Sequence, residues 1–331
     1  MSSKTTASKN LSPEVSLSSE DRRLFDAAFK TARAHHGREF TFYLPGMIRY
    51  GKERGLYPAV SITGDRCSLQ CEHCRGKLLE PMLKAEDPVL LGEICKRLAE
   101  NGAKGILLTG GSDLKGRLPW KQFGKAIREI KDNTDLFISA HTGFIDPCTA
   151  RFLKQAGVTQ GLMDVMGDAE TATRIYHLSG LKKVRGSLEA IKNSGLELIP
   201  HIVAGLYYGQ LRAENAALET ISRYRPKALV IVVLTPLKGT PLFHVSPPSP
   251  IEIGRLIAAA RLMMPDVPIS LGCERPRNRD GWLMEKLALR AGANRMAVWS
   301  GSAIREARNL DLNARFQATC CSLDYRPEFA M

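Results

Sequence analysis

The chain has 331 residues, of which 44% are hydrophobic and 24% are charged. These values are typical of a globular protein with a substantial core, and they exclude a chain that is disordered throughout or a collagen-like fibre. The formal net charge of +13 favours acidic partners such as nucleic acid, an anionic cofactor or an acidic carrier protein, without choosing among them.

The first residues are rich in serine and threonine and lack the apolar core of a signal peptide, so we expect a loose tail there. No apolar run reaches the length of a transmembrane helix, which predicts no membrane partner. We therefore expect a cytoplasmic protein. In that reducing compartment, its eight cysteines should serve metal or redox chemistry rather than disulfides.

From about residue 58, short apolar strands alternate with amphipathic helices. The predicted strands are 59–63, 105–109, 136–140, 161–165, 196–203, 228–234, 267–271 and 294–298. The predicted helices are 88–101, 120–131, 147–156, 180–193, 213–224, 251–264 and 280–291.

This alternation indicates an α/β fold with a parallel sheet, and eight repeats favour a (β/α)8 TIM-type barrel over a doubly wound open sheet. We expect a tail and helical extension over 1–55 and the barrel over 56–305. A C-terminal tail over 306–331 should fold across the barrel mouth. Barrel enzymes place their chemistry at the C-terminal ends of the strands, so reactive residues are expected in the loops there.

One such loop carries three cysteines. Cys67, Cys71 and Cys74 follow the first predicted strand with C-x₃-C-x₂-C spacing. Three thiolates on one short loop can hold three corners of a 4Fe-4S cluster and leave the fourth iron open. The alternative is a zinc site, but zinc usually takes four protein ligands, and His73 is the only further candidate nearby.

Here the sequence resembles the radical S-adenosylmethionine (SAM) superfamily, whose signature is this triplet. The resemblance implies that the open iron binds the methionine part of SAM. One electron from the cluster then splits SAM into methionine and a 5′-deoxyadenosyl radical. The protein's own task would be to position and shield that radical. The resemblance covers about residues 56–300.

Further matches to the superfamily lie at later strand ends. Gly110, Gly111 and Ser112 resemble its Gly-Gly-Glu motif, whose backbone meets the amino group of SAM; Ser112 replaces the glutamate. Asp164 could hold the ribose or amino group, or could be a helix cap or a solvated acid. Arg185 could pair with the carboxylate of SAM, or could lie on a solvated helix face.

The run 199–206 resembles the strand-five motif of the superfamily, which packs beside the adenine. His201 stands where the motif has its first glycine, and Gly205 follows. His141 and His201 both lie at predicted strand ends. Either could face the cavity, or could be a hydrogen-bonded structural histidine.

The run 141–209 is similar to biotin synthase. Four other segments look like the two-component lipoyl synthase known mainly from archaea, in which two related radical SAM proteins share the work. They are 42–46, the extension of the triplet over 71–77, the Gly-Cys-Glu-Arg-Pro-Arg run within 271–277, and 319–322.

Three more cysteines are candidate ligands of a second, auxiliary 4Fe-4S cluster. Cys273 follows the seventh strand, and Cys320 and Cys321 lie in the tail. Cys148 or Ser322 could supply a fourth ligand, and the alternative is that these thiols bind nothing. Cys95 shares the apolar face of its helix and is expected to be a core residue.

The resemblance to lipoyl synthase implies sulfur insertion at C6 or C8 of an octanoyl chain on a lipoyl-carrier domain, with the auxiliary cluster as sulfur donor. It also implies an electron donor such as ferredoxin and allows a second radical SAM subunit. One rival is a biotin-synthase-like enzyme for a small molecule, such as a mutase or a metallocofactor maturase. Others are nucleic-acid modification, for which the chain shows no binding module, and a non-catalytic electron-transfer protein.

Overall fold

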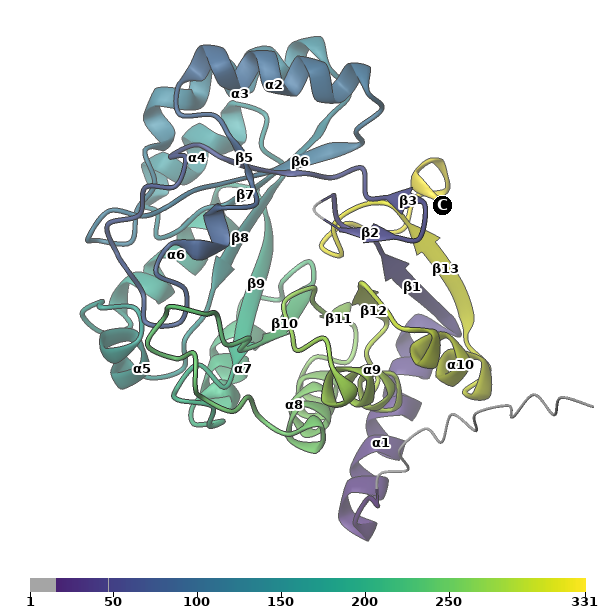
Figure 1. Ribbon diagram of the computed structural model, residues 1–331. Coiled ribbons are helices and arrows are strands. Elements are labelled where there is room, and N and C mark those ends of the chain that lie inside the picture. The colour runs from purple at the N-terminus through teal and green to yellow at the C-terminus, as the bar shows by residue number, and fades with distance from the viewer. Residues whose placement is uncertain (1–15, 47) are drawn as a thin grey trace, which may run out of the picture.

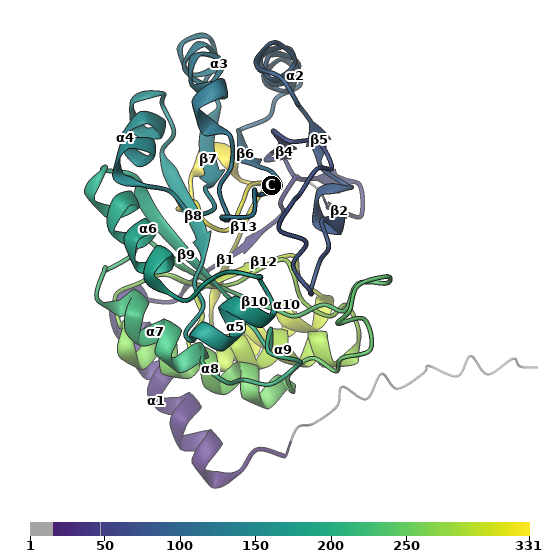
Figure 2. The same ribbon diagram turned by 90° about the vertical axis from the view of Figure 1, so that its left-hand side faces the viewer.

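The computed structural model describes residues 16–46 and 48–331. The expected loose tail falls mainly on residues 1–15, which lie outside the described residues. A large curled sheet forms the centre of the molecule, and helices cover its outer face (Figure 1 and Figure 2). Its eleven strands are β1 (Glu39–Tyr43), β4 (Ala59–Ser61), β5 (Leu83–Lys84), β6 (Gly105–Thr109), β7 (Phe137–His141), β8 (Gln160–Asp164), β9 (Glu197–Ala204), β10 (Leu229–Val233), β11 (Ile269–Leu271), β12 (Arg295–Ala297) and β13 (Asn313–Gln317).

All neighbouring strands of this sheet run parallel, so each needs a crossover connection, and helices provide most of them. A separate antiparallel pair is formed by β2 (Arg49–Tyr50) and β3 (Glu53–Arg54). The helices are α1 (Ser19–His36), α2 (Pro88–Glu100), α3 (Trp120–Asn133), α4 (Pro147–Gln155), α5 (Ala169–Arg174), α6 (Lys182–Asn193), α7 (Glu214–Ser222), α8 (Pro250–Met263), α9 (Arg279–Arg290) and α10 (Gly301–Asn309), with short 3₁₀ turns at η1 (Lys77–Leu79) and η2 (Pro327–Phe329).

The α/β barrel architecture is confirmed, and all eight predicted strands are present as β4 and β6 to β12. The strand order is β13-β1-β12-β11-β10-β9-β8-β7-β6-β4-β5, so the sheet is an open, curled half-barrel with β13 and β5 at its edges. The expected closed ring is not formed because β12 pairs with β1 on the side where closure would require β4.

Two strands come from segments that we expected to lie outside the barrel. β1 belongs to the N-terminal extension and lies between β12 and β13, with Phe42 opposite both Met296 and Phe316. The ring of Phe42 stacks on that of Phe316 at 5.3 Å. The sheet therefore reaches beyond residues 56–305. In β1 and β13, polar side chains such as Glu39 and Arg315 interrupt the apolar runs that revealed the other strands.

The C-terminal tail lies at the opposite end of the barrel from the one expected. Gln160, the first residue of β8, donates from Nε2 to the Ser322 carbonyl at 3.1 Å. The Arg326 guanidinium lies 5.5 Å from the ring centre of Phe137, the first residue of β7. The tail therefore closes the N-terminal ends of the strands, and the expectation that it covers the mouth is wrong. Polar side chains at the strand starts bind its backbone there.

Side-chain caps and glycines end the helices as the sequence predicts. Asp146 accepts from the Thr149 amide at 2.7 Å to begin α4, and Ser249 forms a capping box with Glu252 at the start of α8. Gly157 follows α4 with φ of +101°, a conformation that favours glycine. No helix of the described residues is long and apolar enough to span a membrane.

Candidate functional site: a cavity between two sets of cysteines

A cavity of about 370 Å³ lies inside the curled sheet. It collects the six predicted cysteine ligands and most of the residues predicted to bind SAM. Its lining includes Cys67, Cys71, Cys74, Cys273, Cys320, Cys321, Gly110, Gly111, Ser112, His141, Asp164 and His201.

The triplet loop follows β4 at the mouth of the half-barrel, and local hydrogen bonds hold its shape. Gln70 donates from Nε2 to the Cys67 carbonyl at 2.6 Å, and the Arg75 amide donates to the Cys71 carbonyl at 2.9 Å. Gln70 and Arg75 both have left-handed backbone conformations, with φ of 48° and 46°. These turns fold the loop back so that all three thiols line the cavity.

The thiols of Cys71 and Cys74 hydrogen-bond to each other. This contact lowers the pKa of Cys74, and His73 lowers it further; the same contact and burial raise the pKa of Cys71. One thiolate is therefore already favoured before any metal binds. Thiolate is the form that ligates iron, so the donor set suits an iron–sulfur cluster.

His73 lies half-buried within the triplet loop, and its buried Nδ1 atom has no hydrogen-bond partner among the described residues. Its ring lies 5.2 Å from that of Tyr176. No group of three His, Cys, Asp or Glu side chains in the described ranges converges closely enough to hold a single metal ion. The zinc alternative needs such a group, whereas a cubane cluster offers several iron atoms to separate thiolates.

The Gly-Gly-Ser loop after β6 packs directly against the triplet loop. A β-carbon on Gly111 would lie 2.0 Å from the Arg66 carbonyl oxygen and 2.5 Å from Cβ of Cys67, so only glycine fits. The Ser68 amide donates to the Ser112 carbonyl at 2.8 Å. The loop therefore holds the triplet in place, in addition to any contact that its backbone makes with SAM.

Asp164, His141 and His201 form a polar layer across the middle of the cavity. Nε2 of His141 lies 3.5 Å from Oδ1 of Asp164, and Tyr176 donates its hydroxyl to Oδ2 at 3.2 Å. Burial alone would raise the pKa of Asp164, but His141 overcomes it and lowers the value to about 2. Asp164 is therefore an anion in the cavity and not a solvated loop acid.

The pKa values of the two histidines of this layer are shifted in opposite directions, although their ring centres are only 5.5 Å apart. For His141, burial opposes protonation, but the Asp164 contact outweighs it and raises the pKa. For His201, burial lowers the pKa to about 4, helped by His141, so this ring is neutral. Nδ1 of His201 lies 3.2 Å from the Ile199 carbonyl oxygen.

The second cysteine set joins Cys273, which is exposed after β11, to Cys320 and Cys321 of the tail. Cys321 is 5% exposed and packs in an apolar layer with Tyr43, Leu162 and Ile199. Cys320 hydrogen-bonds to Cys321, which lowers the pKa of Cys320 to about 6. Burial raises the pKa of Cys273 to about 11, and the Cys320 thiolate contributes to that rise. The three thiols therefore lie within electrostatic reach of one another.

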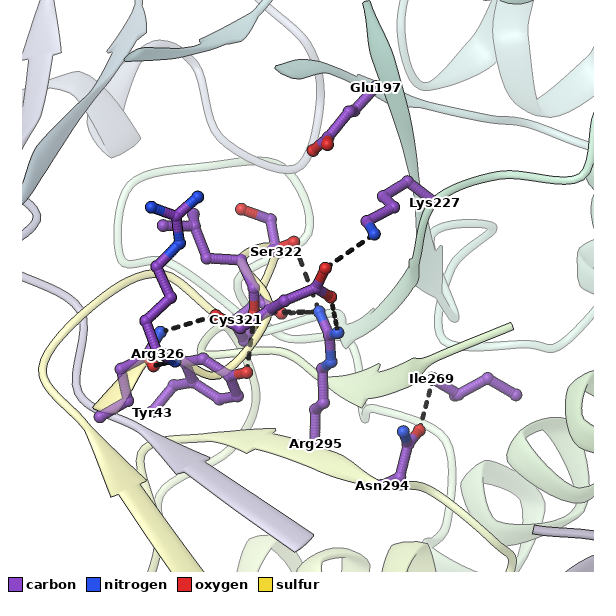
Figure 3. A network of polar contacts seen from close by, with 12 residues as sticks. Tyr43, Glu197, Lys227, Ile269, Asn294, Arg295, Cys321, Ser322 and Arg326 are labelled. Carbon is purple, nitrogen blue, oxygen red and sulfur yellow. Dashed lines mark hydrogen bonds and ion pairs between the residues drawn. The ribbon is translucent and has the colours of Figure 1, made fainter. Parts of the chain in front are cut away.

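A buried polar network fixes this part of the tail (Figure 3). Arg295, the first residue of β12, donates to the carbonyls of Cys321 at 3.3 Å and Leu323 at 3.0 Å, and it pairs with Asp324. Lys227 also pairs with Asp324, at 2.7 Å. These contacts set the backbone that carries the two adjacent cysteines.

Two further residues join the network from the sheet. Gln160 Oε1 accepts from the Ser322 hydroxyl at 2.8 Å, and Tyr43 donates its hydroxyl to the Leu323 carbonyl at 2.7 Å. The sequence analysis missed Gln160, Tyr43 and Arg295. Their signal is a polar side chain inside a short apolar strand, where it must find a buried partner.

The Gly-Cys-Glu-Arg-Pro-Arg run after β11 divides into structural and cavity-facing residues. Arg275 is 1% exposed; it donates to Glu285 Oε1 at 2.7 Å and to the Ala297 and Val298 carbonyls. Its role is to fasten the loop to α9 and β12. Glu274, by contrast, lines the cavity next to Cys273.

Four other predicted residues lie outside this cavity. Arg185 is exposed on α6 and lines a separate depression. Gly205 ends β9 with φ of +81° and donates its amide to Glu214. Cys148 is exposed at the start of α4. Cys95 is fully buried in the core, as predicted.

Comparisons with known proteins find a family model and relatives that match parts of this chain. A family model, the Biotin and Thiamin Synthesis associated domain, matches residues 230–318, which include Cys273. Biotin synthase of Clostridioides difficile (strain 630) is 25% identical over 261 residues, covering 76% of each chain. Biotin synthase of Beijerinckia indica is 31% identical over 176 residues, covering 52% of this chain and 53% of its own length.

Two solved structures share the fold. Methylornithine synthase aligns with a TM-score of 0.61 and 20% identity, over 90% of both chains. The FeFe-hydrogenase maturase from Carboxydothermus hydrogenoformans aligns with a TM-score of 0.62 and 14% identity, over 95% of this chain and 76% of its own. The cysteine signature lies at the mouth of such a barrel, and the chain is similar over 76% of its length to a relative named biotin synthase.

Proposed function

We propose that this enzyme inserts sulfur into an apolar acyl chain, using a second cluster at the base of its cavity. The observation that carries the proposal is that both cysteine sets line one cavity. Radical generation at the mouth and a sulfur source at the base would then act on a substrate lying between them. The family match over 230–318 is consistent with an auxiliary cluster.

The wall between the two sets supports an apolar substrate. Leu107, Leu162, Val230 and Val232 line the cavity along three strands. Such a wall favours a hydrocarbon chain through the hydrophobic effect and offers it no acid or base. The SAM-bound cluster would supply a radical able to break an unactivated carbon–hydrogen bond.

The chain's own residues would bind and orient the cofactors. Cys67, Cys71 and Cys74 would hold the first cluster, and the Gly110–Gly111 backbone would approach the amino group of SAM. Asp164, an anion held by His141 and Tyr176, would attract the positively charged sulfonium or amino end of SAM. Cys273, Cys320 and Cys321 would hold the second cluster.

For the substrate, we propose an octanoyl chain on a lipoyl-carrier domain, as in two-component lipoyl synthases. The net charge of +13 suits an acidic carrier domain and an electron donor such as ferredoxin. A second related radical SAM subunit would complete the reaction. Such association should weaken as salt rises, because added ions screen charge over about 10 Å at 0.1 M.

A second candidate is a biotin-synthase-like reaction on a free small molecule. The names of the relatives favour it over the carrier-bound substrate. The structural neighbours include a synthase and a maturase, so the fold is not restricted to sulfur insertion.

The test is anaerobic turnover of reconstituted protein with SAM, reductant and an octanoylated carrier peptide, with and without a partner subunit. Mass spectrometry should find one or two added sulfur atoms. A peptide unchanged in both reactions would contradict the lipoyl proposal. Release of 5′-deoxyadenosine with a small-molecule acceptor would then support the second candidate.

A further inference from the structure

The second cysteine set is one ligand short of the four that a cubane cluster takes. Neither of the residues proposed from the sequence fills the gap. Cys148 is exposed at the start of α4 and does not line the cavity. The Ser322 hydroxyl donates to Gln160 at 2.8 Å, inside the network that fixes the tail.

His141 faces this gap from the polar layer above. It lines the same cavity as Cys273, Cys320 and Cys321. Sheet register places His141 opposite Leu162, and Leu162 packs with Cys321 in one apolar cluster. The negative charge of Cys320 also contributes to the raised pKa of His141, as expected for near neighbours.

The ring of His141 is held as a metal-binding histidine usually is. Nε2 lies 3.5 Å from Asp164 Oδ1, and Tyr176 anchors the other carboxylate oxygen. Histidine ligands usually give their second ring nitrogen to a carboxylate in this way, which fixes the tautomer and strengthens the ligand. Nδ1 has no hydrogen bond to any described residue and is left as the donor atom.

We propose that Nδ1 of His141 is the fourth protein ligand of the second cluster. The proposal rests on the second cluster of the proposed function. Asp164 would then both attract SAM and orient the histidine ligand of that cluster. His201 is the natural comparison within the layer, since its ring is 5.5 Å away but its Nδ1 already meets the Ile199 carbonyl.

The test observes the second cluster alone. The parent protein is the full chain carrying Cys67→Ala, Cys71→Ala and Cys74→Ala. It is labelled with ¹⁵N-histidine, reconstituted with iron and sulfide, and reduced. Electron–nuclear double resonance then measures the coupling between iron and nitrogen. This parent should retain about four irons and show ¹⁵N coupling. Adding His141→Cys should keep the iron but abolish the coupling, since a thiolate replaces the imidazole. Adding His201→Asn should leave the coupling in place.

The outcomes separate the two proposals. A parent with about four irons and no ¹⁵N coupling would overturn the His141 ligand while keeping the second cluster. If the ¹⁵N coupling survived His141→Cys, the nitrogen ligand would be another histidine. The His141 ligand would again be overturned and the second cluster kept. A parent without iron would overturn the second cluster itself and, with it, the proposed sulfur insertion. The first readout comes from an unaltered His141, so it does not depend on whether a His141 variant folds.

Discussion

The two cysteine sets differ in how the chain builds them. The mouth set occupies eight consecutive positions, Cys67 to Cys74, and its shape comes from turns within that loop and from the adjacent Gly-Gly-Ser loop. The base set joins Cys273 to Cys320 and Cys321, 47 or 48 positions later, and needs the tail fixed under the barrel. A local site is a property of one loop, whereas the base set depends on the whole fold.

The largest expected effect is on radical generation. Cys67→Ala, Cys71→Ala or Cys74→Ala should each reduce release of 5′-deoxyadenosine by about a thousandfold or more, because the cluster loses one of three ligands. Cys148→Ala is the matched control, since this thiol is exposed outside the cavity. Chromatography of reduced reactions measures the product. Full SAM cleavage by all three variants would remove the mouth set from the chemistry.

Changes at the base should separate SAM cleavage from product formation. Cys320→Ala and Cys321→Ala should abolish sulfur transfer but keep most release of 5′-deoxyadenosine, since the mouth loop does not depend on these thiols. Both products are quantified in the same reaction. If the sulfur-containing product formed at the normal rate, the base cysteines would have no part in the reaction.

Loosening the tail should affect the base set and spare the mouth set. Arg295→Ala removes the donor to two tail carbonyls and one partner of Asp324, and should destabilise the fold by about 1–3 kcal/mol. Denaturant unfolding of the apoprotein measures this loss. Arg151→Ala, on the exposed side of α4, should stay within about 0.5 kcal/mol. Equal stability of the two variants would show that the network does not hold the tail.

The smallest effect lies outside both sets and concerns acid stability. Asp21 pairs with Arg255 at 2.6 Å, joining α1 to α8, and these contacts lower its pKa to about 2. The unfolded value is about 3.9, so this contribution is full above pH 4 and is lost as pH falls towards 2. Asp21→Asn should be less stable than the parent at pH 6, and the difference should shrink at pH 2. A constant difference across that range would contradict the assignment.

The sequence predicts the features that depend on local patterns and misses those that depend on distant contacts. The eight barrel strands and the triplet were found because their patterns are local. β1 and β13 were missed because polar side chains interrupt their apolar runs, and β1 pairs with β12 and β13 from a distant part of the chain. The position of the tail depends on Gln160 and Arg295, whose partners lie far away in the sequence. Arg185 was predicted from a local motif to bind SAM, but the structure places it on the exposed side of α6, outside the cavity.

The most direct test of the two-set account is the iron content of three reconstituted proteins. The unchanged chain should bind about eight irons, because two cubane clusters contribute four each. The variant lacking Cys67, Cys71 and Cys74 should bind about four, and so should the variant lacking Cys273, Cys320 and Cys321. About four irons in the unchanged chain, with none in the first variant and four in the second, would contradict the account.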